Sequence, residues 1–243
     1  MTSTFRVAVI GSGPGGLSCA AHAAELGVSH VLLESEKHAS HTIYQYQKGK
    51  HVMAEPGVLP LRSPMQFGAG KREAVLMQWN KDLQKHKVNV RYGSHVTEIS
   101  GAKGAFEIHT ANGEKYVAEH VVLCIGMQGN LRKLGVPGDD SDLVQYQLDD
   151  PGVYSGETIV VVGAGDAAVE NALALVDDNR VIIVNRNEEF ARLKQGNLDL
   201  VLAAISDGKM ECRYGTTAVE VKTIETDGKP GCFVAQTPQG IES

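Results

Sequence analysis

Residues 7–16 read VAVIGSGPGG, a short apolar run that passes directly into a glycine-rich turn. Such a run is typical of a strand that is buried on both faces of a parallel sheet. In the turn, Gly11 permits a sharp bend, Gly13 lets a pyrophosphate approach the backbone, and Gly16 lets the following helix pack closely on the strand. We therefore predict a dinucleotide-binding turn close to the start of the chain.

The residues that follow complete a βαβ unit around this turn. An alanine-rich helix is predicted over residues 17–26, and Gly27 is placed to end it. A second apolar strand over residues 31–33 leads to Glu34, where a carboxylate can accept hydrogen bonds from a ribose 2′-hydroxyl. Because strand, turn, helix and acid agree, we favour a dinucleotide site over a turn with a purely structural role.

The composition limits the classes of function. The 243 residues suffice for one large or two modest domains, and a net charge of −6 without a run of Lys or Arg gives no footprint for nucleic acid or a membrane surface. The N-terminus enters the first strand directly, so we expect no signal peptide, and no apolar run reaches the ~18 residues of a membrane span. Four scattered cysteines without a CxxC predict reduced thiols in a cytoplasmic protein.

The segment over residues 35–70 is long and has little periodicity, which is typical of a functional loop. Its three histidines, His38, His41 and His51, suggest a metal site, but they lack a cluster of Cys, Asp or Glu at the spacing of metal ligands. We therefore expect solvated histidines and no metal.

The middle of the chain predicts an amphipathic helix, a strand, a small antiparallel meander and a further buried strand. Asn112-Gly113 is the hairpin turn signal of the meander. The predicted elements are the helix over 71–87, the strand over 88–92, the meander strands over 96–99, 106–110 and 116–118, and the buried strand over 121–126.

A second fingerprint follows, because residues 158–168 read TIVVVGAGDAA, a buried strand and a turn of GxGxxA form. A helix is predicted over residues 169–176, and a strand over 181–184 that leads to Asn185-Arg186 instead of an acid. Two such fingerprints indicate two nucleotide-binding domains. The second domain is completed by a helix over 197–208, a strand over 210–214 and a hairpin through 227–231.

The end of this later strand discriminates between cofactors. An acid there would bind the ribose of NAD and repel a 2′-phosphate, whereas a cation can pair with that phosphate. Arg186, with Arg192 as a second cation, therefore favours NADP, and NAD stays allowed. The alternative is that Arg186 is a solvated surface cation.

Four motifs stand along the chain, namely GSGPGG (11–16), CIG followed by LGVPG (124–126 and 134–138), VGAGDAAVE (162–170) and NRNEEF (185–190). Together they resemble the motifs of the thioredoxin reductase-like flavoproteins, which have two dinucleotide-binding domains. The resemblance implies an α/β fold of two Rossmann-like, three-layer β/β/α domains, the second inserted in the first or following it. It implies a FAD-binding domain over residues 1–126 and an NAD(P)H-binding domain over residues 127–243.

The resemblance also assigns the cofactor-binding residues. For FAD it places Gly11, Gly13, Gly15 and Gly16 at the pyrophosphate with Pro14 among them, Glu34 at the adenosine ribose with Ser35 next to it, the backbone of Val96 at the adenine, and Gly126 near the flavin. For NADP it places Gly163, Gly165, Asp166 and Ala167 at the diphosphate, and Arg186 at the 2′-phosphate with Asn185 next to it. No catalytic side chain is expected, because hydride transfer from nicotinamide C4 to flavin N5 requires stacking geometry and exclusion of water.

The chain departs from this family at three places. Thioredoxin reductases carry a CxxC before the second fingerprint, but residues 145–151 read QYQLDDP here, so no dithiol relay is expected. IYQY at 43–46 resembles the bacilliredoxin reductase branch, yet that branch has a cysteine where this chain has Gly15, so its thiol chemistry is not expected either. The family returns to the FAD domain about where this chain ends. We expect a chain cut at that hinge, with a split protein or an incomplete module as alternatives.

These features predict an FAD-dependent NAD(P)H oxidoreductase that passes electrons to an external acceptor, like the thioredoxin reductase-like ferredoxin-NADP reductases. The expected partner is a redox protein or domain, ferredoxin-like or other, with no nucleic acid and no membrane, and a homodimer is allowed. A flavin monooxygenase is the second enzyme hypothesis, but its FxGxxxH signature is absent. The third hypothesis is a nucleotide-binding or sensing module of a larger protein.

Overall fold

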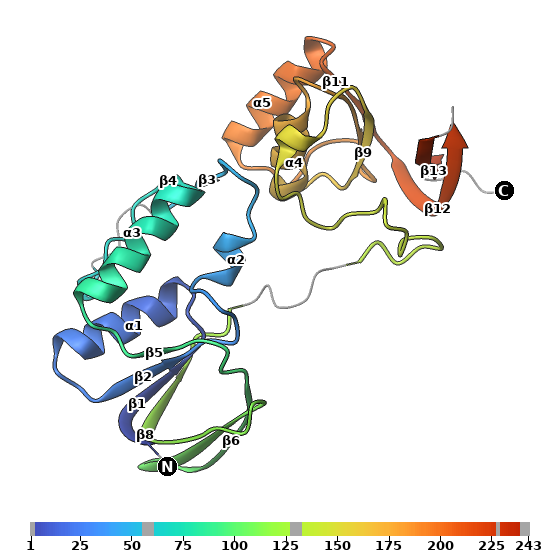
Figure 1. Ribbon diagram of the computed structural model, residues 1–243. Coiled ribbons are helices and arrows are strands. Elements are labelled where there is room, and N and C mark those ends of the chain that lie inside the picture. Colours follow the sequence, from blue (N-terminus) through green and yellow to red (C-terminus); the bar gives the residue numbers. More distant parts are fainter. Residues whose placement is uncertain (1–2, 55–60, 127–132, 227–228, 239–243) are drawn as a thin grey trace. The chain divides into compact units, whose positions relative to one another are not determined.

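The computed structural model describes residues 3–54, 61–126, 133–226 and 229–238, and Figure 1 shows its elements in colours that follow the sequence. The chain divides into two compact units, Met1–Asn130 and Leu131–Ser243. Each unit contains one of the two predicted glycine turns. Within the described ranges, no helix has the length and apolar character that crossing a membrane requires.

Unit 1 is built on a six-stranded mixed sheet with the order β5-β2-β1-β8-β7-β6. The strands β5, β2, β1 and β8 are parallel, and β7 and β6 continue the sheet as an antiparallel meander. The glycine turn follows β1 and therefore lies at the carboxyl edge of the parallel strands, where ligands bind in open α/β sheets. The strands are β1 (Ser3–Ile10), β2 (His30–Leu33), β5 (Val90–Arg91), β6 (Val96–Ala102), β7 (Ala105–Thr110) and β8 (Lys115–Leu123).

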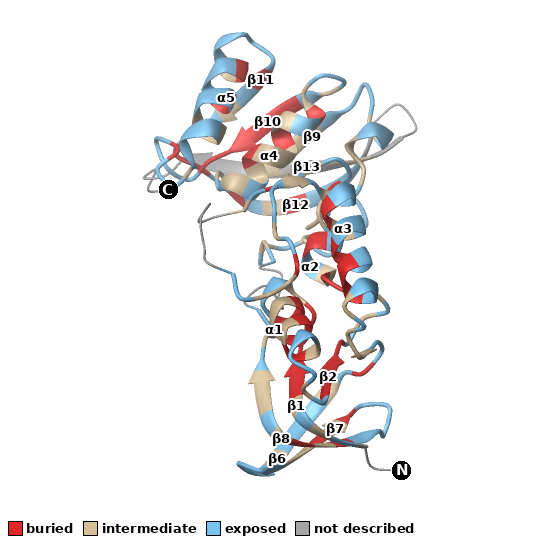
Figure 2. Cartoon of the chain, turned by 90° about the vertical axis from the view of Figure 1, so that its left-hand side faces the viewer, coloured by how far each residue is buried: buried red, intermediate tan, exposed pale blue. Residues whose placement is uncertain are grey.

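Helices α1 (Pro14–Glu25) and α3 (Arg72–Lys85) pack on one face of this sheet. Because side chains alternate along a strand, β1 contributes to two cores. Figure 2 shows the buried sides of α1 and α3 and the buried strands β1 and β2 in red. The core beneath the helices includes Val9, Leu17, Leu32, Trp79 and Leu83, and the core on the opposite face includes Ala8, Ile10, Val31, Leu33, Ile108 and Tyr116.

Several predicted boundaries in unit 1 are wrong. Strand β6 runs to Ala102 instead of residue 99, and β5 covers Val90–Arg91 instead of 88–92. Two further differences have a clear physical reason. Helix α1 begins at Pro14 instead of residue 17, because proline fits the first turn of a helix, where its missing N–H has no partner to lose. The strands predicted over 116–118 and 121–126 are one strand, β8, which pairs with both β1 and β7. Glu119 interrupts the apolar run in the sequence, but its side chain is 46% exposed and its carboxylate lies 3.5 Å from Arg6 Nε, so the strand continues through this position without burying the charge.

The segment between β2 and α3 contains more regular structure than its sequence indicates. A short helix, α2 (His41–Tyr44), follows Glu34 by a few residues, and β3 (His51–Val52) pairs with β4 (Gly70–Lys71). Residues 55–60 of this predicted loop lie outside the described residues. This segment therefore contains regular structure at α2 and at the β3–β4 pair.

Unit 2 repeats the βαβ arrangement on a smaller scale. Its parallel sheet has the order β11-β10-β9, and helices α4 and α5 pack on it around Val169, Val181 and Val201. The turn of the predicted final hairpin, residues 227–228, lies outside the described residues, but the two strands pair as predicted. The elements are η1 (Pro151–Val153), β9 (Thr158–Val162), α4 (Asp166–Leu175), β10 (Arg180–Val184), α5 (Gln195–Ser206), β11 (Met210–Arg213), β12 (Thr216–Thr226) and β13 (Lys229–Pro238).

Candidate functional site

The turn after β1 shows why two of its glycines are required by the fold. Gly11 has a φ of +95°, which turns the chain away from the direction of β1. Its N–H donates to the carbonyl of Leu33 over 2.8 Å, which holds the start of the turn at the end of β2. A Cβ added to Gly16 would overlap the carbonyl oxygen of Gly11 and lie 3.0 Å from its carbonyl carbon. A side chain at either position would therefore strain the turn or separate α1 from β1.

Gly13 differs from these two glycines because its side-chain position is open. Its backbone is extended, and an added Cβ would meet no heavy atom within 4 Å. Pro14 then begins α1, and no side chain caps that helix. The first N–H groups of a helix lack intrahelical acceptors and attract an anion. The fold does not need glycine at this position, whereas a pyrophosphate that approaches the backbone does, so the turn fits a dinucleotide.

Gly15 faces a thiol, because its added Cβ would lie 3.9 Å from Cys124 Sγ. Cys19, Cys124 and Cys212 are free cysteines, and the side chain of Cys232 lies outside the described residues. Burial raises the pKa of Cys19 and Cys124, and raises the pKa of Cys212 to about 11. The thiolate is the reactive form of cysteine. These three thiols are therefore protonated and poorly nucleophilic at neutral pH.

Glu34, at the end of β2, is 6% exposed, and each of its carboxylate oxygens accepts two hydrogen bonds. Oε2 accepts the N–H of Ser12 over 2.9 Å and the Ser12 hydroxyl. Oε1 accepts the N–H of Glu36 over 2.9 Å and the hydroxyl of Ser35 over 3.0 Å. Burial would raise the pKa of Glu34, but these hydrogen bonds outweigh it and hold the pKa below its usual value. The site therefore presents an ionised acceptor beside the glycine turn.

Gly126 follows β8 by three residues and has a φ of +68°. The chain just before it lies against the glycine turn, since an added Cβ on Gly11 would be 3.0 Å from the carbonyl carbon of Cys124 and 3.3 Å from Cα of Ile125. The structure thus brings the segment that contains Gly126 to the first glycine of the turn.

Val96 is the first residue of β6 and packs against the core opposite the helices. The connection before it is tied to the end of β2, because the N–H of Ser94 donates to the carbonyl of Glu34 over 2.8 Å. Val96 is therefore two residues from a backbone contact with Glu34, but no contact places Val96 itself at the glycine turn among the residues that the structure describes.

Two of the three loop histidines, His38 and His41, are less solvated than predicted, whereas His51 is exposed as predicted. His38 Nε2 and His41 Nδ1 are 3.2 Å apart, and both side chains are partly buried. The ring of His38 also lies on Tyr44, with 3.7 Å between centroids. In the described part of the chain, no group of three or more His, Cys, Asp or Glu residues is arranged to hold a metal ion.

The turn after β9 repeats the geometry of the first turn. Gly163 has a φ of +125°, and its N–H donates to the carbonyl of Val184 over 3.0 Å. Gly165 caps α4, and an added Cβ there would meet no heavy atom within 4 Å. The third small residue is Ala168, whose Cβ would be 3.7 Å from a Cβ on Gly163, so this turn has room for a methyl group.

Asp166 and Ala167 open α4, and their side chains have different surroundings. Ala167 is exposed. Asp166 Oδ1 accepts the N–H of Lys194 over 3.1 Å and the side-chain amide of Asn197 over 2.7 Å. Asp166 therefore joins the start of α4 to the start of α5, and Asn197 is a residue of this site that the motif did not reveal.

Asn185 and Arg186, at the end of β10, differ in their surroundings: the first is buried and the second is exposed. Asn185 is 1% exposed; its amide donates to the carbonyl of Glu189 over 3.1 Å and its Oδ1 accepts the N–H of Asn187 over 3.0 Å. The buried side chain of Asn185 thus stabilises the loop over residues 185–189 through these two hydrogen bonds. Arg186 and Arg192 are exposed and make no ion pair with any residue that the structure describes.

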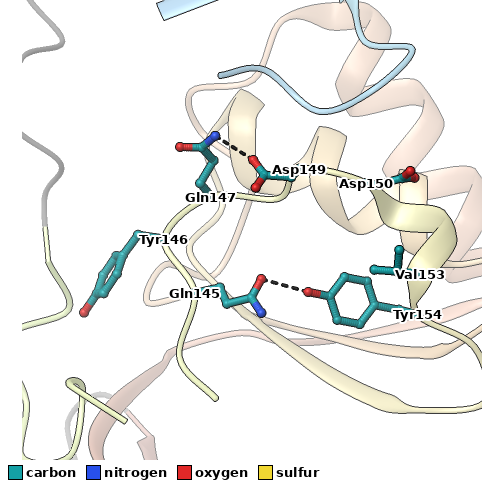
Figure 3. A pocket seen from close by; sticks show the side chains of 7 residues that line it. All are labelled: Gln145, Tyr146, Gln147, Asp149, Asp150, Val153 and Tyr154. Carbon is teal, nitrogen blue, oxygen red and sulfur yellow. Dashed lines mark hydrogen bonds between the residues drawn. The ribbon is translucent and has the colours of Figure 1, made fainter. Parts of the chain in front are cut away.

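A hollow of about 550 Å³ lies in unit 2 where the sequence lacks the CxxC, over residues 145–154 (Figure 3). Four of its polar side chains form two hydrogen-bonded pairs. The Tyr154 hydroxyl donates to Gln145 Oε1 over 2.8 Å, and the Gln147 amide donates to Asp149 Oδ1 over 2.7 Å. The lining residues are Gln145, Tyr146, Gln147, Asp149, Asp150, Val153 and Tyr154, so this hollow contains no thiol.

Known proteins are similar to this chain in sequence and in fold. A family model described as pyridine nucleotide-disulphide oxidoreductase matches residues 8–226. The chain is 28% identical over 242 residues to a ferredoxin–NADP reductase from Ignicoccus hospitalis, with 97% of this chain and 72% of that protein covered. It is 28% identical over 199 residues to a thioredoxin reductase from Rickettsia conorii, with 78% of this chain and 58% of that protein covered. The chain thus spans only part of each relative.

The solved bacillithiol disulfide reductase from Staphylococcus aureus matches with a TM-score of 0.79 at 18% identity, over 96% of this chain and 74% of that one. At this identity the likeness shows the fold, and it confirms the predicted α/β architecture of Rossmann-like units. The family match includes both glycine turns and confirms the resemblance to thioredoxin reductase-like proteins. The chain therefore belongs to the pyridine nucleotide-disulphide oxidoreductase family.

Proposed function

We propose that the chain is an FAD-dependent NAD(P)H oxidoreductase that passes electrons from a nicotinamide cofactor to an external acceptor without an internal dithiol. The observation that carries the proposal is the pair of glycine turns. In each turn the side-chain position of the second glycine, Gly13 or Gly165, is open, so the fold itself does not require glycine there. A dinucleotide that contacts the backbone at this position does require it. Reductases of this family use FAD and NADP(H).

Residues 1–126, which make up most of unit 1 (Met1–Asn130), are the proposed FAD-binding domain. Its glycine turn and the N-terminus of α1 would hold the pyrophosphate, and the ionised carboxylate of Glu34 would accept a hydrogen bond from the adenosine ribose. Gly126 belongs to the segment against Gly11 and is proposed to lie near the flavin. The remaining residues proposed to contact FAD are Pro14, Gly15, Gly16, Ser35 and Val96.

Residues 127–243, which include all of unit 2 (Leu131–Ser243), are the proposed NAD(P)H-binding domain. The turn at Gly163 and Gly165, with the first residues of α4, would hold the diphosphate. Arg186 is exposed and free of ion pairs with described residues, so its guanidinium can meet a 2′-phosphate. The buried amide of Asn185 holds the loop that carries this arginine.

FAD and the nicotinamide, when bound, would supply hydride transfer from C4 to N5. The protein's own contribution is to bind and orient the cofactors and to exclude water, and it needs no acid or base for that step. The chain has no CxxC, so an internal disulfide relay is not proposed. We propose a one-electron acceptor of the ferredoxin class as partner, in keeping with the named activity of the Ignicoccus relative.

Alkylation of the folded chain by iodoacetamide at neutral pH is expected to leave NADPH-dependent reduction of ferricyanide within about twofold of the untreated rate. The reason is that burial keeps the Cys19, Cys124 and Cys212 thiols protonated and unreactive. The measurement is the steady-state rate before and after treatment, with labelling counted by mass spectrometry. Urea-unfolded protein serves as the control that the reagent is active. Loss of most of the activity on labelling would show that a thiol takes part.

A further inference from the structure

Ser12 and Ser40, called here the serine clamp, form a buried hydrogen-bonded pair behind the carboxylate of Glu34. Ser12 is 0% exposed and Ser40 is 2% exposed. The N–H of Ser40 lies 3.1 Å from both the carbonyl oxygen and the hydroxyl oxygen of Ser12, and the Ser40 hydroxyl donates to the same carbonyl over 3.1 Å. The Ser12 hydroxyl in turn donates to Glu34 Oε2. A continuous chain of hydrogen bonds therefore joins the loop before α2 to Glu34.

The backbone of Ser40 shows that this contact is imposed by its surroundings. Ser40 has φ +59° and ψ +45°, a left-handed conformation that is unfavourable for a residue with a Cβ. A serine before a helix usually caps it, but no side-chain cap is formed at α2, and the hydroxyl is directed to Ser12 instead. Capping of α2 thus does not account for the conformation of Ser40, whereas the hydrogen bonds to Ser12 do.

The two carboxylate oxygens of Glu34 differ in how easily a ligand could replace their side-chain hydrogen-bond donors. Oε2 faces the buried serine clamp, and the Ser12 hydroxyl cannot turn away without losing its bond from the N–H of Ser40. Oε1 accepts the hydroxyl of Ser35, which is an exposed residue. A ribose hydroxyl can displace an exposed serine hydroxyl with little cost, since one hydrogen bond replaces another. Oε1 is therefore the oxygen at which a ligand hydroxyl can replace a protein hydroxyl, while its bond from the N–H of Glu36 stays in place.

We propose that Ser12 and Ser40 are positioning residues that fix the Glu34 carboxylate with Oε1 toward the adenosine ribose of FAD. The proposal rests on the proposed function, because it assumes that unit 1 binds FAD. It gives Ser12, at the first x position of the GxGxxG turn, a role in orienting Glu34 that is separate from the contacts of the three glycines. It also explains why a buried serine is held in a left-handed backbone.

The test is a double-mutant cycle on FAD affinity, measured by flavin fluorescence with the full chain. Ser12→Ala is expected to weaken FAD binding about tenfold, the equivalent of a charge-assisted hydrogen bond. In a Glu34→Ala background, Ser12→Ala is expected to cause no further loss, because the clamp acts through that carboxylate. Ser40→Gly keeps the left-handed backbone and the N–H, so it is expected to weaken binding by less than Ser12→Ala. Ser29→Ala, an exposed serine at the opposite end of β2, is the control.

Equal loss from Ser12→Ala in both backgrounds would show a general structural role and overturn the proposal. So would FAD binding by Ser12→Ala that equals that of the unchanged chain. If Ser12→Ala lowers the urea midpoint, the same cycle is run with Ser40→Gly and decides the question. An unchanged chain that binds no FAD would instead overturn the proposed function, and the clamp with it.

Discussion

Replacement of Gly16 by alanine is expected to destabilise unit 1 by about 3 kcal/mol or more, the upper end of the cost of overpacking. The added Cβ would overlap the carbonyl oxygen of Gly11, which belongs to the backbone and cannot rotate away. Relief requires α1 to move from β1, although the two pack through fully buried Leu17 and Val9. Small domains have only about 5–15 kcal/mol of stability, so this single methyl group removes a large part of it.

The matched variant Gly13→Ala is expected to separate folding from binding. Its backbone is extended and its side-chain position is open, so the unfolding free energy should change by no more than about 1 kcal/mol. FAD affinity should fall about tenfold or more, because the methyl group occupies the space where a pyrophosphate approaches. Urea unfolding followed by circular dichroism, with FAD content per chain, measures both effects.

Gly68→Ala is the control for these two variants, since its side-chain position is also open and it lies outside the glycine turn. It should change neither stability nor FAD content. The interpretation of the turn would be contradicted if Gly13→Ala bound FAD as tightly as the unchanged chain, or if Gly16→Ala were as stable as Gly68→Ala.

Arg186→Ala is expected to raise the dissociation constant for NADP⁺ by about 10- to 100-fold and to leave that for NAD⁺ within about twofold. The guanidinium is exposed and unpaired among described residues, and a charge-assisted bond to a 2′-phosphate contributes about 1.5–3 kcal/mol. Isothermal titration calorimetry of the full chain with each nucleotide measures the change without requiring turnover. The loop should persist in the variant, because Asn185 holds it through Glu189 and Asn187.

Arg180→Ala provides the same change of charge at the other end of β10. Arg180 begins this strand and lies 3.5 Å from Glu211, about 20 Å along the chain from Arg186 at ~3.3 Å per residue. It should affect both nucleotides equally and weakly. If Arg186→Ala also acted equally on NADP⁺ and NAD⁺, Arg186 would be a solvated surface cation and the preference for NADP would have to be abandoned.

The sequence was sufficient for those parts of the fold that depend on local pattern. The apolar run before Gly11, the glycines themselves and Glu34 at the end of β2 are encoded within 28 residues, and the structure places them as the βαβ pattern requires. The error at β8 arose because Glu119 breaks an apolar run, although a half-exposed carboxylate that lies 3.5 Å from Arg6 Nε is compatible with a continuous strand.

The finer parts of the site depend on contacts that a local pattern cannot reveal. Ser40 reaches Ser12 from 28 residues away, and its left-handed backbone has no signal in a serine residue. Asn197 likewise reaches Asp166 from the next helix. The hydroxyl at Ser12, between two glycines of a dinucleotide turn, was the one available signal for a side-chain role in the turn.

The most direct test of the central claim is an anaerobic absorbance titration of the chain, supplied with FAD and freed of excess, with NADPH and then NADH. We expect flavin to remain bound and its visible absorbance to bleach, at a lower concentration of NADPH than of NADH. This result would establish electron transfer from a nicotinamide to a flavin without a dithiol. A chain that retains no flavin, or bound flavin that neither nucleotide bleaches, would contradict the proposed oxidoreductase.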